Sequence, residues 1–104
     1  MQFVVNAHDG KDVLEKRMEV RPRHLENMLR NKEHVICAGG ILDEAGKPIG
    51  SALVLDFETR AELDAYLANE PYIIEKVWED VKVEPLNLVI LKGEKVGKSA
   101  RWEA

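Results

Sequence analysis

The sequence predicts an α+β domain in which two helices cover one face of an antiparallel sheet. The chain has 104 residues, enough for one domain with its own core, and 45% apolar against 33% charged residues are typical of a folded protein. Short runs rich in Val, Ile and Leu flank two segments with helical periodicity. Their order is strand, helix, strand, strand, helix, strand (βαββαβ), which is the split βαβ arrangement of ferredoxin-like domains.

The first strand and the first helix are expected in the N-terminal third of the chain. Residues 2–7 (QFVVNA) are β-branched and aromatic and precede a polar loop. Asp12 is expected to cap the helix and to form a capping box with Glu15. Pro22 either bends this helix near Arg21 or starts a second helix. Apolar residues at helical spacing are expected to form its buried face: Leu14, Met18, Leu25, Met28 and Leu29.

A hairpin is expected next. Residues 34–42 (HVICAGGIL) are a continuous apolar run and predict a buried strand, and residues 51–58 (SALVLDFE) predict its partner. Two adjacent glycines, Gly39 and Gly40, indicate a bulge or a close approach of the backbone to another group. Cys37 is expected to be a buried apolar residue rather than a reactive thiol. As the single cysteine it excludes an internal disulfide and suits a reducing compartment.

The second helix is expected over residues 59–70. Thr59 is a suitable N-cap, and Glu62 completes a capping box. The apolar stripe of this helix consists of Leu63, Tyr66 and Leu67.

The C-terminal part is expected to contain a short extra helix and the last strand. The helix follows Pro71 within residues 70–78, and the strand covers residues 81–91, where Pro85 indicates an edge position or a bulge. Residues 1–91 are therefore expected to form a single domain. Residues 92–104 are a polar tail containing Trp102, either disordered or docking on a partner as an arm.

A homodimer that stacks sheet against sheet is expected, because two helices cover only one face of the sheet. The apolar strand residues are too many to lie beneath two helices: Val4, Ile36, Leu53, Leu55, Leu88 and Ile90.

Composition and motifs argue against several classes of function. The formal charge of −4 gives no basic surface for nucleic acid or an anionic membrane. The N-terminus does not read as a signal peptide, and no apolar run approaches the roughly 20 residues of a membrane helix, so a cytoplasmic protein is expected. No phosphate-loop, CxxC or GxSxG motif is present, and His8, His24 and His34 lack metal-ligand spacing, so neither a cofactor nor a metal is expected.

One polar group on the first helix has two interpretations. Arg17, Arg21 and His24 are spaced four and three residues apart and share a helix face. They are either a solvated surface or a ligand-binding site. The second interpretation rests on the two neighbouring arginines, which are favourable only with an anion between them. A histidine with a carboxylate partner is suited to proton transfer. The candidate carboxylates are Asp9, Asp12 and Glu70.

The motifs along residues 1–91 resemble those of the YciI-like family. The most specific are "RPxHL" and "DPY", and the matching residues are Arg21, Pro22, His24 and Leu25 for the first, and Glu70, Pro71 and Tyr72 for the second. Weaker matches are Asp9, Arg17, Ala38 and Gly39. The sequence departs from the family where "NEPY" places Glu70 at the aspartate of "DPY".

The resemblance implies a ferredoxin-like, dimeric α/β-barrel fold and a histidine–acid pair in a cleft between sheet and helices. A related member removes chloride from a chlorinated hydroxyquinol. By motif the histidine is His24, and the acid is Asp9 or Glu70.

Two functions are compatible with these features. In the first, the chain is a lyase-like or isomerase-like enzyme that transfers a proton on a small oxygenated substrate. Arg17 and Arg21 bind its anionic group, and Tyr72 closes the cleft or donates a hydrogen bond. In the second, it is a non-catalytic ligand-binding or dimeric structural module, in which an ion pair between Arg21 and an acid fixes the bend at Pro22.

Overall fold

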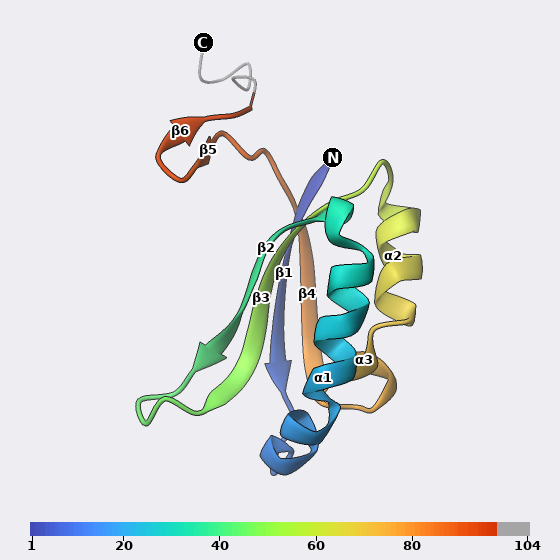
Figure 1. Ribbon diagram of the computed structural model, residues 1–104, viewed down its shortest axis with the longest axis vertical. Helices are drawn as coiled ribbons and strands as arrows, with labels where there is room; N and C mark the ends of the chain where they lie inside the picture. Colours follow the sequence, from blue (N-terminus) through green and yellow to red (C-terminus); the bar gives the residue numbers. More distant parts are fainter. Residues whose placement is uncertain (98–104) are drawn as a thin grey trace.

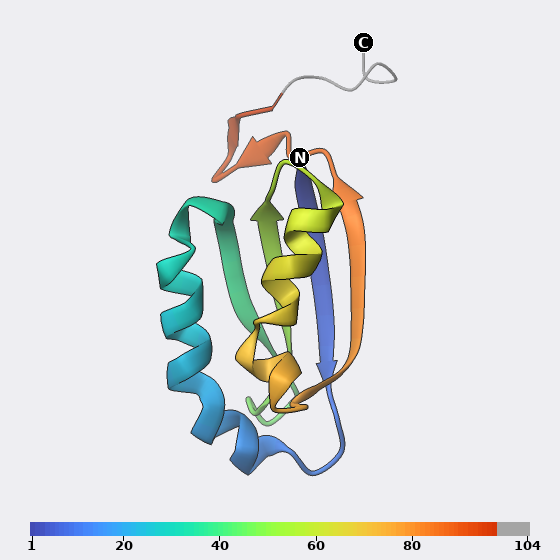
Figure 2. The same ribbon diagram turned by 90° about the vertical axis from the view of Figure 1, so that its right-hand side faces the viewer.

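The computed structural model describes residues 1–97. The main sheet contains four antiparallel strands in the order β2-β3-β1-β4, and Figures 1 and 2 show the helices on one of its faces. The strands are β1 (Gln2–Asp9), β2 (Val35–Leu42), β3 (Pro48–Asp56) and β4 (Trp78–Leu86). The helices are α1 (Leu14–Arg30), a 3₁₀ turn at Lys32–His34, α2 (Arg60–Ala68) and α3 (Pro71–Ile74). The predicted α+β class and the ferredoxin-like arrangement are confirmed.

The core lies between the helices and the central strands. Alternate residues of β1 point toward the helices and are buried, namely Phe3, Val5 and Ala7. Leu53 and Leu55 do the same on β3, and Leu63 and Tyr72 cover them from the helical layer. Successive strand residues face opposite sides, so the residues between these point to the other face of the sheet. No helix of residues 1–97 covers that face (Figure 1).

The buried face of α1 differs from the predicted one. Its buried residues are Arg17, Val20, His24 and Met28. Of the five apolar residues expected there, only Met28 is buried, and Leu29 is 71% exposed. The helix is rotated because Arg17 and His24 find buried partners on other elements, which offsets the cost of burying them.

The start of α1 also corrects the prediction. Val13, not Asp12, is the N-cap residue, and no side-chain hydrogen bond caps the helix, so the capping box with Glu15 is not formed. Asp12 has φ 57°, a left-handed conformation in the turn after β1. Pro22 lies inside one continuous helix, so a second helix does not begin there. Figure 2 shows the first turns of α1 at an angle to the rest.

The hairpin of β2 and β3 is confirmed, but β2 is not the buried strand predicted. It is an edge strand whose middle residues are exposed, and Cys37 is exposed as well. The prediction was wrong because an apolar run does not show whether another element covers the strand. The register shifts lie at the ends of β2 and not at its glycines. Gly40 instead comes close to Arg17, whose Nη2 atom would lie 3.8 Å from an added Cβ. β3 begins at Pro48, three residues before the predicted start.

The second half of the chain follows the prediction in outline. Thr59 caps α2 by accepting a hydrogen bond from the Glu62 N–H at 3.1 Å. The Glu62 carboxylate accepts from the N–H of Glu58 rather than of Thr59, so the capping box is shifted by one residue. The extra helix is confirmed but spans only Pro71–Ile74, and the last strand runs over Trp78–Leu86 instead of 81–91. This strand is at the sheet edge, one of the two positions that Pro85 indicated.

A small second sheet follows β4. The strands β5 (Ile90–Leu91) and β6 (Glu94–Lys95) pair with each other, and Figure 1 shows them projecting on the side of the sheet away from the helices. Part of the expected polar tail therefore forms a hairpin. Trp102 lies outside the described residues, and the division of the chain at residue 91 stays a prediction. Within residues 1–97, no helix has the length and apolar character needed to cross a membrane.

Candidate functional site

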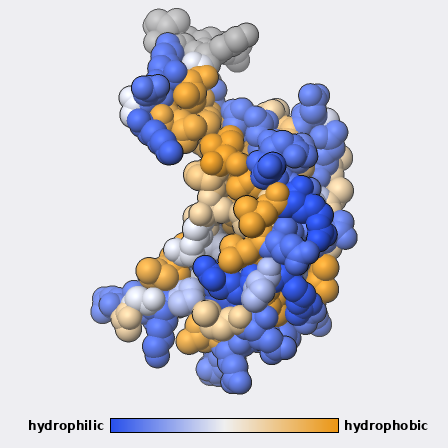
Figure 3. Space-filling view, in the orientation of Figure 1, coloured by the Kyte–Doolittle hydropathy of each residue, from blue (hydrophilic) through white to orange (hydrophobic). Residues whose placement is uncertain are grey.

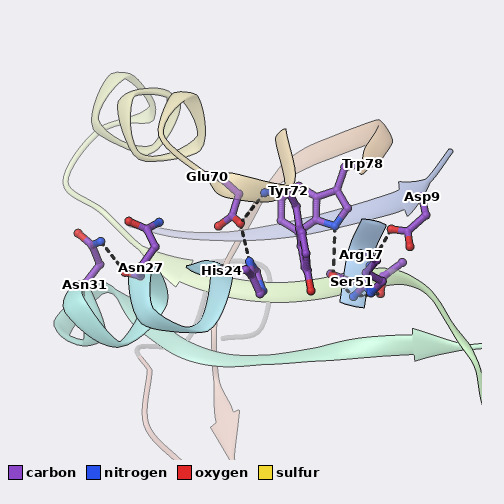
Figure 4. A network of polar contacts seen from close by, with 10 residues as sticks. Asp9, Arg17, His24, Asn27, Asn31, Ser51, Glu70, Tyr72 and Trp78 are labelled. Atoms are coloured by element: carbon purple, nitrogen blue, oxygen red, sulfur yellow. Dashed lines mark hydrogen bonds and ion pairs between the residues drawn. The ribbon is translucent and has the colours of Figure 1, made fainter. Parts of the chain in front are cut away.

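A buried histidine–carboxylate pair joins α1 to the start of α3. Nδ1 of His24 lies 2.5 Å from Oε1 of Glu70, and both side chains are buried (Figure 4). Glu70 is placed there by the sequence around it, because Pro71 starts α3 and Glu70 becomes its N-cap. The same Oε1 atom accepts a hydrogen bond from the backbone N–H of Tyr72 at 3.1 Å. An ionised carboxylate only accepts hydrogen bonds, so Nδ1 carries the hydrogen and Nε2 is the ring nitrogen left for a ligand.

Aromatic rings hold the imidazole of His24 in place. Its ring stacks on Tyr72 with centroids 4.0 Å apart and an interplanar angle of 19°. Trp78 meets the same ring edge-on at 5.9 Å. These contacts leave the imidazole little freedom to rotate away from Glu70.

A second buried network surrounds Arg17. Its Nη1 atom donates to Asp9 at 2.7 Å, and its Nη2 atom donates to Ser51 Oγ at 2.8 Å and to the Gly50 carbonyl at 3.0 Å. The guanidinium also lies over the Tyr72 ring, 4.7 Å from its centroid. The resemblance left Asp9 and Glu70 as alternative partners of His24. In the structure Glu70 pairs with His24, and Asp9 pairs with Arg17 instead.

Ser51 and Trp78 complete this network and were missed by the sequence analysis. The indole N–H of Trp78 donates to Ser51 Oγ at 3.2 Å, and both residues are buried. One signal was available for Ser51, which lies two residues before Leu53 and four before Leu55 and so shares their inward face. For Trp78 the sequence contained no comparable signal.

A cavity of about 790 Å³ opens between α1 and the β2–β3 hairpin. Figure 3 shows apolar side chains gathered between these elements. The polar residues that line the cavity are Arg17, Arg21, His24, Lys32, Ser51 and Tyr72. The apolar lining includes four of the five α1 residues that were expected in the core: Met18, Leu25, Met28 and Leu29. The cavity therefore has a polar region around His24 and apolar walls, as is typical of small-molecule sites.

Three cations line the cavity, namely Arg17, Arg21 and Lys32, and of these Arg17 is bound by protein acceptors. Arg21 is the one next to the bend at Pro22. It is exposed and makes no hydrogen bond or ion pair with any of residues 1–97, so the expected ion pair at the Pro22 bend is not formed there. Burial raises the pKa of Tyr72 above its usual value, although the charges of Arg17 and Arg21 oppose this. Tyr72 therefore stays a neutral phenol at neutral pH and is a hydrogen-bond donor.

Several polar atoms behind the pair make no hydrogen bond within the described residues: Asn27 Nδ2, Tyr66 Oη and Glu70 Oε2. Burial, and next the charge of Glu70, raises the pKa of Tyr66 far above its usual value. Asn27 follows His24 by one helical turn, and Figure 4 shows it near the same carboxylate. Glu70 is therefore a buried carboxyl group with one oxygen engaged twice and one oxygen without a partner in residues 1–97.

The relationship to known proteins is decided by a family model. The model of the YCII-related domain matches residues 1–87. The chain belongs to the YCII-related family. Protein YciI of Escherichia coli O6:H1 is 32% identical over 97 residues, which cover 86% of this chain and 99% of that protein. The aspercryptin biosynthesis cluster protein B of Emericella nidulans is 31% identical over 87 residues, covering 75% of this chain and 56% of that protein.

Solved structures share the YCII-related fold at lower identity. The 5-chloro-2-hydroxyhydroquinone dehydrochlorinase of Burkholderia phenoliruptrix, solved with 2,5-dihydroxybenzoquinone, superposes with a TM-score of 0.77 at 21% identity over 83% of this chain and 93% of that chain. An antibiotic biosynthesis monooxygenase has a TM-score of 0.53 at 15% identity, covering 86% of this chain and 98% of that chain. These similarities support the ferredoxin-like fold.

Proposed function

We propose that this YCII-related protein is a small-molecule enzyme in which His24 transfers a proton and Glu70 orients it. The observation that carries the proposal is the buried His24–Glu70 pair beside a cavity. Glu70 fixes the tautomer in which Nε2 accepts a proton, and its charge stabilises the imidazolium that results. Such a pair typically contributes about 10²–10⁴-fold to a rate.

The cavity favours a hydroxylated substrate with an apolar or aromatic body. Arg21 supplies a cation for a phenolate, a carboxylate or a departing anion, and the apolar walls hold the rest of the molecule. Arg17 is engaged by three protein acceptors, so its role is to position Tyr72 and Ser51 more than to bind substrate directly. In an elimination, the substrate loses one proton to Nε2 and one leaving group that departs with its bonding electrons. No oxidant or reductant is required.

The dehydrochlorinase with the same fold supports this reaction class, because its substrate is a chlorinated hydroxyhydroquinone. The test is chloride release from 5-chloro-2-hydroxyhydroquinone and from other chlorinated phenols. Wild type is expected to release chloride and His24→Gln to lose at least about 10²-fold in rate. His34→Gln is the matched control, since His34 also stacks on an aromatic ring but does not line the cavity. Equal rates for wild type and His24→Gln would exclude the role of His24.

A non-catalytic ligand-binding module is the second candidate. The observation that favours it is the Arg17 network, in which the charged groups are satisfied by the protein itself. In that case 2,5-dihydroxybenzoquinone would bind with a measurable heat in calorimetry, while none of the chlorinated compounds would be turned over.

A homodimer through the helix-free face of the sheet is part of the proposal. On this face Val4 of β1 lies opposite Val54 of β3, which lies opposite the exposed Cys37 of β2, and Ala52 is two residues before Val54 on β3. Figure 1 shows the face bordered by the projecting β5–β6 hairpin and the curved end of β2–β3. Ile90 in this hairpin is an exposed apolar residue, and a second copy stacked on the sheet would cover the face and the hairpin. The cytoplasmic location stays a prediction.

A further inference from the structure

The hydroxyl of Ser51 has both of its acceptor positions occupied. Arg17 Nη2 lies 2.8 Å from Ser51 Oγ and Trp78 Nε1 lies 3.2 Å from it. A guanidinium and an indole N–H only donate, so Ser51 accepts from both. A serine hydroxyl has two lone pairs and one hydrogen, which means that these two contacts use both lone pairs and neither can receive the hydrogen.

The hydrogen of Ser51 is consequently directed to a third acceptor. Within residues 1–97, Ser51 Oγ donates to no protein acceptor, and the residue is 2% exposed. Ser51 lines the cavity beside His24. Arg17 and Trp78 are thus positioning residues that turn the Ser51 hydroxyl into a donor with a fixed direction toward the cavity.

Tyr72 supplies a second donor at the same place. Its ring stacks on His24 and also lies under the Arg17 guanidinium, so Tyr72 and Ser51 both contact Arg17 (Figure 4). Tyr72 lines the cavity, and its hydroxyl makes no hydrogen bond with the other described residues. The phenol stays protonated in this buried position and donates.

We propose that Ser51 and Tyr72 form a two-donor site for a substrate oxygen that becomes negatively charged. This deepens the proposed function and rests on it. Two O–H donors next to a buried guanidinium favour a phenolate or enolate oxygen over a neutral hydroxyl. As His24 Nε2 takes the proton from the substrate, the electron pair of the broken bond is left on the conjugated oxygen that these donors hold. The substrate class is therefore an acidic phenol or an enolisable ketone.

The experiment measures binding of 4-nitrophenol, whose phenolate is visible by absorbance, to the full chain across a pH range. Wild type is expected to bind the phenolate and to lower the apparent pKa of the bound phenol. Ser51→Ala and Tyr72→Phe should each weaken phenolate binding by about tenfold or more and reduce that shift. Ser51→Thr, which keeps the hydroxyl, should retain the shift. Tyr66→Phe is the matched control, because Tyr66 is a buried tyrosine outside the cavity lining.

The outcomes separate this inference from the proposed function. Binding of 4-nitrophenol requires no turnover, so a loss of phenolate binding in both variants supports the donor site even if no chloride is released from any substrate. Unchanged phenolate affinity in Ser51→Ala and Tyr72→Phe, with each variant folded by circular dichroism, would overturn it. Failure of the wild type to bind 4-nitrophenolate at millimolar concentration would overturn it as well.

Discussion

Oε1 of Glu70 is shared by two hydrogen-bonding partners, Nδ1 of His24 at 2.5 Å and the backbone N–H of Tyr72 at 3.1 Å. A single carboxylate oxygen therefore fixes the imidazole and the first turn of α3 together. Because Glu70 is fully buried, a change of its charge acts on His24 directly and is not screened by water.

The first prediction concerns Glu70→Gln. Glutamine retains an oxygen that can accept from Nδ1 and from the Tyr72 N–H, so the fold is expected to persist. It lacks the charge that stabilises an imidazolium, so turnover should fall by about 10²-fold or more while substrate affinity changes little. Steady-state kinetics on the substrate identified by chloride release measures this. Glu75→Gln, on the surface beside α3, is the control and should leave kcat unchanged.

The second prediction concerns the ion pair between Arg17 and Asp9, in which both side chains are almost fully buried. Removing one partner leaves an uncompensated buried charge, so Arg17→Met is expected to lower the free energy of unfolding by about 3–5 kcal/mol. The double variant Arg17→Met, Asp9→Asn should lose less than the sum of the two single changes. Urea denaturation of the four proteins gives the coupling. A loss below about 1 kcal/mol for Arg17→Met would show that the pair does not hold β1 to α1.

The third prediction concerns Tyr66, whose buried hydroxyl has no partner within residues 1–97. Deleting a buried hydroxyl that makes no hydrogen bond removes a desolvation cost, so Tyr66→Phe should leave the free energy of unfolding unchanged or raise it. Equilibrium unfolding in urea is the measurement. A destabilisation of more than about 1 kcal/mol would mean that the hydroxyl has a bonding partner in solution, for which Glu70 is a candidate because its charge acts on Tyr66.

The fourth prediction concerns the helix-free face of the sheet. Val54 lies at its centre, between Val4 on β1 and Cys37 on β2. If two copies stack there, Val54→Arg would place two buried like charges in the interface and should give a monomer in sedimentation equilibrium. Leu29→Arg is the control because Leu29 is exposed on α1, on the other face of the sheet. A wild type that is already monomeric at micromolar concentration would rule out the dimer.

The sequence predicted the order of elements well because that order depends on local patterns. Thr59 followed by Glu62 marked the start of α2, and Pro71 marked the start of α3, where both occur in the structure. These signals act over a few residues and need no knowledge of the tertiary contacts.

The buried face of α1 could not be predicted from local sequence patterns. Its apolar residues predicted one face, but Arg17 bonds to Ser51, which is 34 residues away, and His24 bonds to Glu70, which is 46 residues away. These long-range partners decide the rotation of the helix, and no local pattern shows them. The same reason left Asp9 and Glu70 as equal candidates for the partner of His24 and left Ser51 and Trp78 unnoticed. The family motif drew attention to His24 and Glu70, whereas hydrogen-bond geometry assigned their pairing.

The protonation of the His24 ring tests the central claim most directly. Nitrogen-15 NMR of the labelled protein, with His8→Gln and His34→Gln used to assign the signals, reports which ring nitrogen carries hydrogen. We expect Nδ1 to be protonated and Nε2 to be bare at neutral pH, with Nε2 gaining a proton when 4-nitrophenol binds and its phenolate absorbance appears. A free protein in which Nε2 carries the hydrogen and Nδ1 is bare, or an Nε2 signal that does not change on binding, would contradict proton transfer by His24.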